Sequence, residues 1–256
     1  MEEFNQNGND VSLYSAKVLD VPITLFDSYA HAADCIAERI RQKEKTFCVA
    51  INPEKICFAH RDSNFQSLLN TTDIQICDGV GIVFAVKLLL GHRVRRCTGV
   101  GLFYELVDRA SEEGWKVFFL GASQESNKIA CSKLQHRYPN LKIVGQHAGF
   151  YEDENAIIEL INHSQADVLF VALGSPKQEY WISKNRNRIN ASYLMGIGGT
   201  LDVVSGMTKR APKFLRRSGL EFLYRLVKEP QRWRRQIVLP GFSLMVIKEM
   251  IVQGHK

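Results

Sequence analysis

Asp78 combines a residue type and a position that suggest acid–base chemistry. It follows the apolar run Ile74–Cys77 and precedes the glycines at positions 79 and 81. A carboxylate at the end of a buried strand could act as a general base that takes the proton of an attacking hydroxyl. The alternative makes Asp78 the N-cap of a helix that begins near Val80, and the local sequence favours that capping role.

Asn52 occupies a comparable position, because it ends another apolar run and precedes Pro53 and Glu54. Its amide could hydrogen-bond a sugar or a base. Pro53 could instead open a helix at its first position with Asn52 as the cap. Here too the local sequence favours capping.

Two further loops offer groups that suit a phosphate or a sugar. In the segment 174–179, Gly-Ser-Pro-Lys-Gln-Glu, Lys177 and Gln178 could donate hydrogen bonds, while Pro176 suits the first turn of a helix. The segment 196–200 is rich in glycine, and Gly198, Gly199 and Thr200 could border a phosphate; a tight turn is the alternative. Neither segment contains the Walker motif G-x-x-x-x-G-K-[ST].

Basic residues could neutralise such an anion. Arg96 lies in a loop with Arg95, where a guanidinium could hold a phosphate through paired hydrogen bonds or simply remain solvated. Lys209 and Arg210 follow the glycine-rich segment. Residues 201–256 contain 12 Lys and Arg against 4 Asp and Glu, whereas the rest of the chain has 21 against 23.

This charge asymmetry predicts an anionic partner for the C-terminal segment. A diphosphate, an acidic membrane surface and nucleic acid are all compatible with it, and so is a solvated helix face. Trp233 stands among arginines, which suits a membrane interface. No D-x-D and no spaced histidine cluster occurs, so we expect neither a metal nor another cofactor.

The six cysteines are scattered without a C-x-x-C pair, which favours a reducing compartment. The N-terminus lacks the basic start and apolar block of a secretory signal. No run approaches the about 20 apolar residues of a spanning helix, and Pro240 and Gly241 interrupt the longest late one, 237–247. We therefore expect a cytoplasmic protein.

Strand-like and helix-like segments alternate along the chain. Nearly continuous apolar runs predict buried parallel strands at 46–51, 74–77, 116–120, 141–144, 168–173 and 193–197. Amphipathic patterns predict helices at 28–41, 80–90, 102–111, 124–137, 154–162 and 178–187. The alternation predicts an α/β fold with a Rossmann-like, doubly wound, mostly parallel sheet and a basic helical C-terminal appendage.

After Asp202 the sequence becomes basic and aromatic, which divides the chain into a Rossmann-like core, 1–205, and a C-terminal appendage, 206–256, whose charge suits a phosphate or a membrane. Ligands of such sheets bind beyond the carboxyl ends of the strands. The loops expected to form the site are therefore 52–54, 77–81, 121–123, 174–178 and 196–200.

Taken in order, these pieces resemble the WecG/TagA/CpsF glycosyltransferases, family 26, from about Phe47 to Arg235. The resemblance rests on Asn-Pro-Glu at 52–54, Asp-Gly at 78–79, Thr-Gly at 98–99, Ala-Leu-Gly-Ser-Pro-Lys-Gln-Glu at 172–179, Gly-Gly-Thr-Leu-Asp at 198–202, Lys-Arg-Ala-Pro at 209–212 and Leu-Glu-Phe-Leu-Tyr-Arg-Leu at 220–226 before Glu-Pro at 229–230.

The resemblance implies an inverting, metal-independent transferase that is peripheral to the inner membrane. Its substrates would be a UDP-sugar carrying an N-acetylmannosamine-type sugar, or its uronic acid, and a polyprenyl-diphosphate-linked N-acetylglucosamine. Asp78 would be the base, Asn52 and Gln178 would line the sugar and nucleotide site, and Gly198, Gly199 and Thr200 would border it. Arg96, Arg225 and Arg232 would contact phosphates.

Departures from the family pattern leave the transferred sugar open. Ala50 stands where some relatives carry Thr, and Gly101 replaces an acidic residue. Another hexose is therefore one alternative. A dehydrogenase or methyltransferase is a weaker one, because the first strand–helix turn lacks G-x-G-x-x-G. A nucleic-acid binder would leave the glycine loops unexplained. The sequence does not fix the oligomeric state, and a homo-oligomer is compatible with it.

Overall fold

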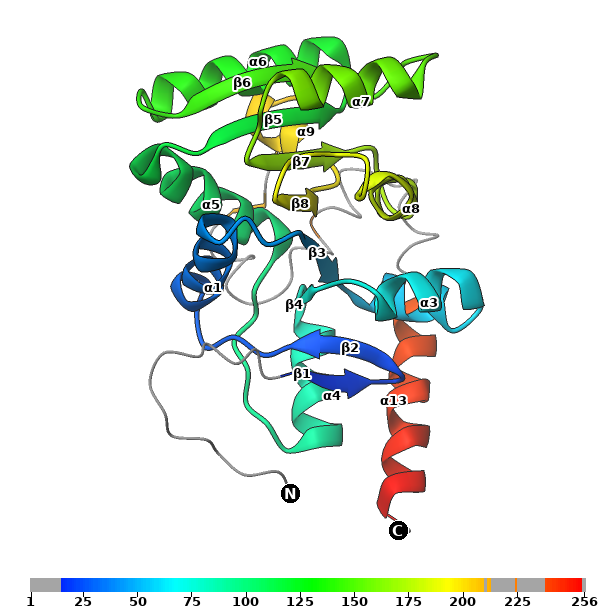
Figure 1. The fold of residues 1–256 in the computed structure, drawn as a ribbon. Coiled ribbons are helices and arrows are strands. Elements are labelled where there is room, and N and C mark those ends of the chain that lie inside the picture. Colours follow the sequence, from blue (N-terminus) through cyan, green and yellow to red (C-terminus); the bar gives the residue numbers. More distant parts are fainter. Residues whose placement is uncertain (1–14, 210, 213–223, 225–237, 255–256) are drawn as a thin grey trace.

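A six-stranded parallel sheet forms the centre of the computed structural model, which describes residues 15–209, 211–212, 224 and 238–254 (Figure 1). Its strands are β3 (Thr46–Ile51), β4 (Ile74–Cys77), β5 (Lys116–Gly121), β6 (Lys142–His147), β7 (Val168–Ala172) and β8 (Tyr193–Gly196). Their order is β4-β3-β8-β7-β5-β6, and each neighbouring pair is parallel. The predicted Rossmann-like fold class is confirmed.

Helices cover both faces of this sheet. The described helices of the core are α1 (Tyr29–Arg41), α2 (Pro53–Ala59), α3 (Ser63–Asn70), α4 (Val80–Leu90), α5 (Gly99–Glu113), α6 (Gln124–Arg137), α7 (Glu154–His163), α8 (Lys177–Asn185) and α9 (Thr200–Ser205). Residues of α2, α3, α7 and α8 pack into one apolar cluster, and residues of α1, α5, α6 and α9 into the other.

The strands divide their side chains between the two clusters because successive residues of a strand point to opposite faces. In β3, Phe47, Val49 and Ile51 belong to the cluster of α2 and α3, whereas Cys48 and Ala50 belong to the cluster of α1 and α5. Every residue of β3 is buried. This explains why the strands are continuously apolar in the sequence rather than alternating.

The crevice for a ligand is set by the strand order. β3 and β8 are neighbours, yet the chain leaves β3 into α2 on one face and leaves β8 into α9 on the other. The two connections diverge, so the carboxyl ends of these strands remain uncovered at the switch point of the sheet. Open α/β sheets bind their ligands at such points.

Two features lie outside the expected pattern. β1 (Ser15–Val18) and β2 (Val21–Thr24) form an antiparallel hairpin beside β4, where Thr24 Oγ1 accepts a 3.0 Å hydrogen bond from the Gln75 amide. α13 (Val238–Gly254) runs through Pro240 and Gly241, which the sequence analysis treated as an interruption. Proline is tolerated in the first turn of a helix, where its missing N–H would have no partner.

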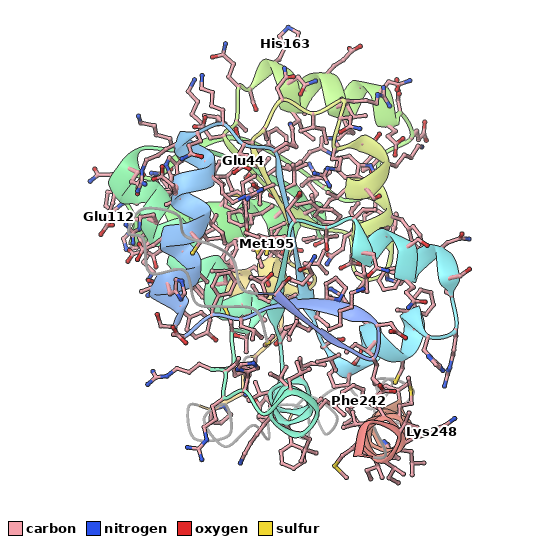
Figure 2. All side chains as sticks on the ribbon, turned by 60° about the horizontal axis from the view of Figure 1, so that its bottom comes forward. Glu44, Glu112, His163, Met195, Phe242 and Lys248 are labelled. Carbon is pink, nitrogen blue, oxygen red and sulfur yellow. The ribbon has the colours of Figure 1, made fainter. Side chains whose placement is uncertain are left out.

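α13 packs against α2 and α4 and runs beside α4 away from the sheet (Figure 1). Phe242 and Val246 are buried in this contact, whereas Lys248 is on the exposed side (Figure 2). Among the described residues, no helix combines the length and the apolar character needed to cross a membrane.

Candidate active site

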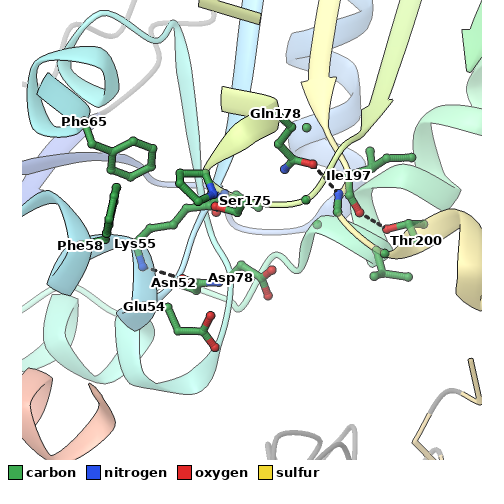
Figure 3. Close-up of a pocket in the computed structure, with 18 of the residues that line it drawn as sticks. Asn52, Glu54, Lys55, Phe58, Phe65, Asp78, Ser175, Gln178, Ile197 and Thr200 are labelled. Atoms are coloured by element: carbon green, nitrogen blue, oxygen red, sulfur yellow. Dashed lines mark hydrogen bonds between the residues drawn. The ribbon is translucent and has the colours of Figure 1, made fainter. Parts of the chain in front are cut away.

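A cavity of about 420 Å³ opens at the switch point of the sheet (Figure 3). Four of the five expected loops line it, namely those after β3, β4, β7 and β8. The loop after β5, at 121–123, does not; there Ser123 caps α6 by accepting from the Ser126 amide. Phe58 and Phe65, from α2 and α3, add an apolar wall that the sequence analysis did not foresee.

Asp78 directs its carboxylate into this cavity (Figure 3). Its backbone N–H donates a 2.7 Å hydrogen bond to the Ile51 carbonyl, which fixes the start of the loop beside β3. The N-cap of α4 is Gly79, at φ +107°, and no side chain caps the helix. The capping interpretation of Asp78 is therefore wrong, because a glycine in the left-handed region turns the chain before the helix begins.

Gly99, the first residue of α5, lies close to Asp78. A Cβ at this position would be 3.7 Å from Asp78 Oδ2 and 3.2 Å from the Ala50 Cβ. Thr98 caps α5 by accepting from the Gly101 amide at 3.0 Å, and its own N–H donates to the Tyr29 hydroxyl at 2.9 Å. The Thr-Gly pair thus lets helix α5 begin directly behind the carboxylate.

Tyr29 also accounts for Gly101, which the sequence analysis noted as a departure. A Cβ on Gly101 would lie 2.5 Å from the Tyr29 ring. The tyrosine therefore occupies the space that a side chain at 101 would need.

Asn52 both caps a helix and lines the cavity. Its side-chain oxygen accepts a 2.9 Å hydrogen bond from the Lys55 amide at the start of α2. The local prediction of a cap is confirmed. The amide nitrogen of Asn52 is not used by that bond, so the side chain can still donate to a ligand.

Gln178 joins the loops after β7 and β8. Its Oε1 accepts a 2.9 Å hydrogen bond from the Gly198 amide, and its Nε2 donates to Glu179 Oε1 at 2.9 Å. Glu179 in turn pairs with the Lys55 ammonium at 2.8 Å. Lys55 lines the cavity and was missed, because a lysine in the first turn of a short helix gives no sequence signal of burial.

The glycine-rich loop after β8 is a tight turn and also borders the cavity. Gly198 has φ +53°, and the Thr200 amide donates to the Ile197 carbonyl at 3.1 Å. Gly198, Gly199 and Thr200 all line the cavity. Asp202, in the first turn of α9, lines it as well and accepts from Ser126 Oγ at 2.7 Å, which fastens α9 to α6.

The remaining predicted site residues do not come together here. Lys177 and Lys209 are exposed and Arg96 is partly buried, and none of the three lines the cavity. Arg210, Arg225 and Arg232 lie outside the described residues. The acidic run 152–154 has local roles, since Asp153 caps α7 and Glu154 bonds Lys184.

Two thiols near Asp78 remain protonated at neutral pH. Burial raises the pKa of Cys77 to about 12, and the neighbouring Asp78 carboxylate raises it further in the same direction. Burial also raises the pKa of Cys97 far above its usual range. Neither thiol is therefore a base at neutral pH, whereas the carboxyl groups of Asp78 and Glu54 both line the cavity.

Comparison with known proteins agrees with this geometry. The family model described as "Glycosyl transferase WecG/TagA/CpsF family" matches residues 16–256. A Bacillus spizizenii protein named N-acetylglucosaminyldiphosphoundecaprenol N-acetyl-beta-D-mannosaminyltransferase is 35% identical over 207 residues, covering 81% of this chain and 80% of that protein. A Bacillus subtilis protein of the same name is 34% identical over 210 residues, covering 82% of each chain.

The family match spans nearly the whole chain, and the relatives are aligned over most of their own length. The resemblance inferred from the motifs is thus confirmed, and the chain is an enzyme that transfers a hexose. It belongs to the WecG/TagA/CpsF family of glycosyltransferases.

Proposed function

We propose that this enzyme transfers N-acetylmannosamine, or its uronic acid, from a UDP-sugar to a polyprenyl-diphosphate-linked N-acetylglucosamine, with inversion at the anomeric carbon. The observation that carries the proposal is the position of the Asp78 carboxylate in a cavity at the switch point of the sheet. The relatives are named for transfer of N-acetylmannosamine to such a lipid-linked acceptor. Cell-surface polysaccharide synthesis would be the process served.

In this proposal Asp78 takes the proton of the acceptor hydroxyl as its oxygen attacks the anomeric carbon. The bond to the UDP oxygen breaks on the opposite side, so a single displacement inverts the centre. Asn52 and Gln178 hold the sugar and the nucleotide through their amides. The turn formed by Gly198, Gly199 and Thr200 borders the donor, where a small loop permits close approach of the backbone.

The leaving diphosphate requires positive charge. Among the described residues that line the cavity, Lys55 and Arg61 are the cations, and the charge of Lys55 is already paired with Glu179. We assign the remaining charge to Arg96, Lys177, Lys209, Arg210, Arg225 and Arg232. The last three belong to the basic segment that we propose as an appendage to a core of residues 1–205, completing the site without a metal.

We also propose that the enzyme works on the anionic inner surface of the plasma membrane. Phe84 on α4 is 61% exposed and Leu244 on α13 is 68% exposed, which is unusual for such large apolar side chains on neighbouring helices. Exposed cations accompany them, including Lys87 and Lys248. Both helices start at the cavity, since Asp78 precedes α4 and Val238 lines the wall. A lipid-linked acceptor held there would keep its chain in the bilayer.

The six cysteines are unpaired and buried, which supports a cytoplasmic location.

Transfer of labelled sugar to a synthetic polyprenyl-diphosphate N-acetylglucosamine, with EDTA present, tests the function. The donors are UDP-N-acetylmannosamine, its uronic acid and another UDP-hexose. We expect transfer from one of the first two. Asp78→Asn should reduce kcat by at least about a hundredfold, because the amide cannot accept the proton.

Asp34→Asn is the matched control, since it removes an exposed carboxylate of α1 that lies outside the cavity. It should leave kcat within about twofold. Transfer only from the other hexose would correct the donor while keeping the reaction. Full activity of Asp78→Asn would refute the assignment of the base, and dependence on a metal would refute the metal-independent mechanism.

A further inference from the structure

A buried ion pair beside the cavity joins Lys55, which lines it, to Glu179, which binds the Gln178 amide. The Lys55 side chain is 8% exposed and that of Glu179 is 1% exposed, and their charged atoms are 2.8 Å apart. Lys55 Nζ also donates to the Ala50 carbonyl at 2.8 Å. The pair thus connects β3 and α2 on one side of the switch point with α8 on the other.

Stability alone does not explain this pair. Glu179 Oε2 is buried without a hydrogen-bond partner in the structure. Removing two charges from water costs several kcal/mol per ion, and apolar residues of the same size often serve as well or better. A pair retained with one oxygen unsatisfied is therefore better explained by what it holds in place.

The group that it holds is the Gln178 amide. A carboxylate only accepts hydrogen bonds, and Glu179 Oε1 lies 2.8 Å from the Lys55 ammonium, which only donates them. Glu179 Oε1 must therefore accept a hydrogen bond from the amide nitrogen of Gln178. This directs the amide oxygen of Gln178 to the Gly198 N–H, which donates to it at 2.9 Å (Figure 3). The amide nitrogen has two protons, and Glu179 uses one of them. The other is left for a ligand of the cavity.

The Gln178 side chain is also closely packed. A Cβ on Gly196 would lie 2.5 Å from Gln178 Nε2, so the amide rests directly on the end of β8. From the Ala50 carbonyl to the Gly198 amide, polar contacts run unbroken across the switch point, through Lys55, Glu179 and Gln178.

We infer that Lys55 and Glu179 are positioning residues for sugar transfer. They act through Gln178 by fixing the orientation of its side-chain amide. The amide in turn holds Gly198 and thus the turn after β8, which borders the donor. The role in transfer rests on the proposed function, whereas the effect on the turn does not.

A double-mutant cycle tests this coupling. The variant Lys55→Met/Glu179→Met replaces both charges with apolar groups of similar size, so the fold is retained. We expect it to lower kcat/KM on the order of tenfold in the wild-type background. In the Gln178→Ala background the same double change should cost less than about twofold, because its target is gone. An equal loss in both backgrounds would overturn the inference.

Lys184→Met/Glu154→Met is the matched control, because it removes an exposed pair, 2.6 Å apart, that also involves α8. It should leave kcat/KM unchanged. Thermal unfolding of each variant separates loss of fold from loss of position. A loss of kcat/KM that follows the melting temperature, with the control affected equally, would assign the pair a purely structural role.

Hydrogen exchange of the segment 196–201 gives a readout that needs no substrate. Faster exchange in Lys55→Met/Glu179→Met, with the rest of the sheet unchanged, would support the coupling to the turn, and unchanged exchange would overturn it. If the wild type transferred no sugar, the proposed function would fail, while this measurement would still decide the positional claim.

Discussion

The surroundings of Asp78 are built from small residues. Gly79 makes the turn, Gly99 lets α5 begin beside the carboxylate, and Ala50 contributes only a methyl group to the floor. A side chain at position 99 would press on the Ala50 methyl group, at 3.2 Å, and contact the Asp78 carboxylate, at 3.7 Å. Gly79 and Gly99 therefore help to place the Asp78 carboxylate as well as to shape the backbone.

Gly99→Ala tests this close approach. The added methyl would lie 3.2 Å from the Ala50 Cβ, which is tighter than ordinary contact, so β3 beside Asp78 must give by a few tenths of an ångström. Misplacing a catalytic group by a fraction of an ångström lowers the rate, and we expect kcat/KM to fall by about tenfold or more. Steady-state kinetics measures it.

Gly241→Ala is the control for that substitution, because a Cβ there meets nothing within 4 Å. The methyl lies on an exposed helical position and should leave the rate unchanged. A Gly99→Ala enzyme as active as the wild type would show that the floor tolerates a larger residue.

Some site residues were predictable from the sequence and others were not. Asp78, Asn52 and Gln178 follow recognisable apolar runs, so their place at the carboxyl edge could be inferred from the fold class. Lys55 and Glu179 could not be assigned as a pair, since they are 124 positions apart and only the strand order brings them together. The capping role predicted for Asp78 failed because the adjacent glycine took over the turn.

At the scale of elements, long apolar or amphipathic runs were predictable and short ones were not. The six predicted strands match β3 to β8 within a few residues. The helices α2, α3 and α9 have 7, 8 and 6 residues, too few for a clear period of 3.6. The hairpin of β1 and β2 has four-residue strands and depends on packing against β4.

The docking of α13 depends on a small number of side chains. Phe242 is 4% exposed and packs beside Gly81 of α4, since its ring would be in ordinary contact, 3.6 Å, with a Cβ at that position. The wall of the cavity near Val238 depends on the same contact, because Cys57 Sγ lies 3.7 Å from the Val238 carbonyl.

Phe242→Ala should loosen α13 without unfolding the sheet. Truncating a buried Phe typically lowers the stability of the folded state by about 3–5 kcal/mol. A peripheral helix such as α13 can undock locally when its contact is weakened in this way. We expect hydrogen exchange of residues 238–254 to accelerate strongly while β3 to β8 keep their protection. Leu244→Ala, on the exposed side of the same helix, should not change the exchange. Uniform acceleration throughout the sheet would instead show that α13 is part of the cooperative core.

At the scale of the molecule, the position of α4 and α13 next to the cavity suits delivery of a lipid-linked acceptor. The pair extends from the cavity away from the sheet, whereas α7 lies at the opposite end of the molecule (Figure 1). An acceptor sugar entering the cavity would thus be delivered from the end that carries the exposed apolar side chains. The basic segment 210–237, which precedes α13 in the chain, adds charge of the sign that attracts an acidic membrane.

The double variant Phe84→Ser/Leu244→Ser tests whether this end contacts lipid. Full burial of either side chain in the bilayer would contribute about 1.5–3 kcal/mol to the free energy of membrane binding. Even partial insertion of both predicts at least about a tenfold loss of affinity for vesicles of phosphatidylglycerol, measured by sedimentation.

The control variant Leu160→Ser removes an apolar side chain of α7 that is 45% exposed, and it should bind vesicles like the wild type. Soluble short-chain acceptor should be used equally well by the double variant, because the cavity is intact. Unchanged vesicle binding would place the membrane contact elsewhere in the chain, while loss of activity on the soluble acceptor would mean that these side chains support the cavity itself.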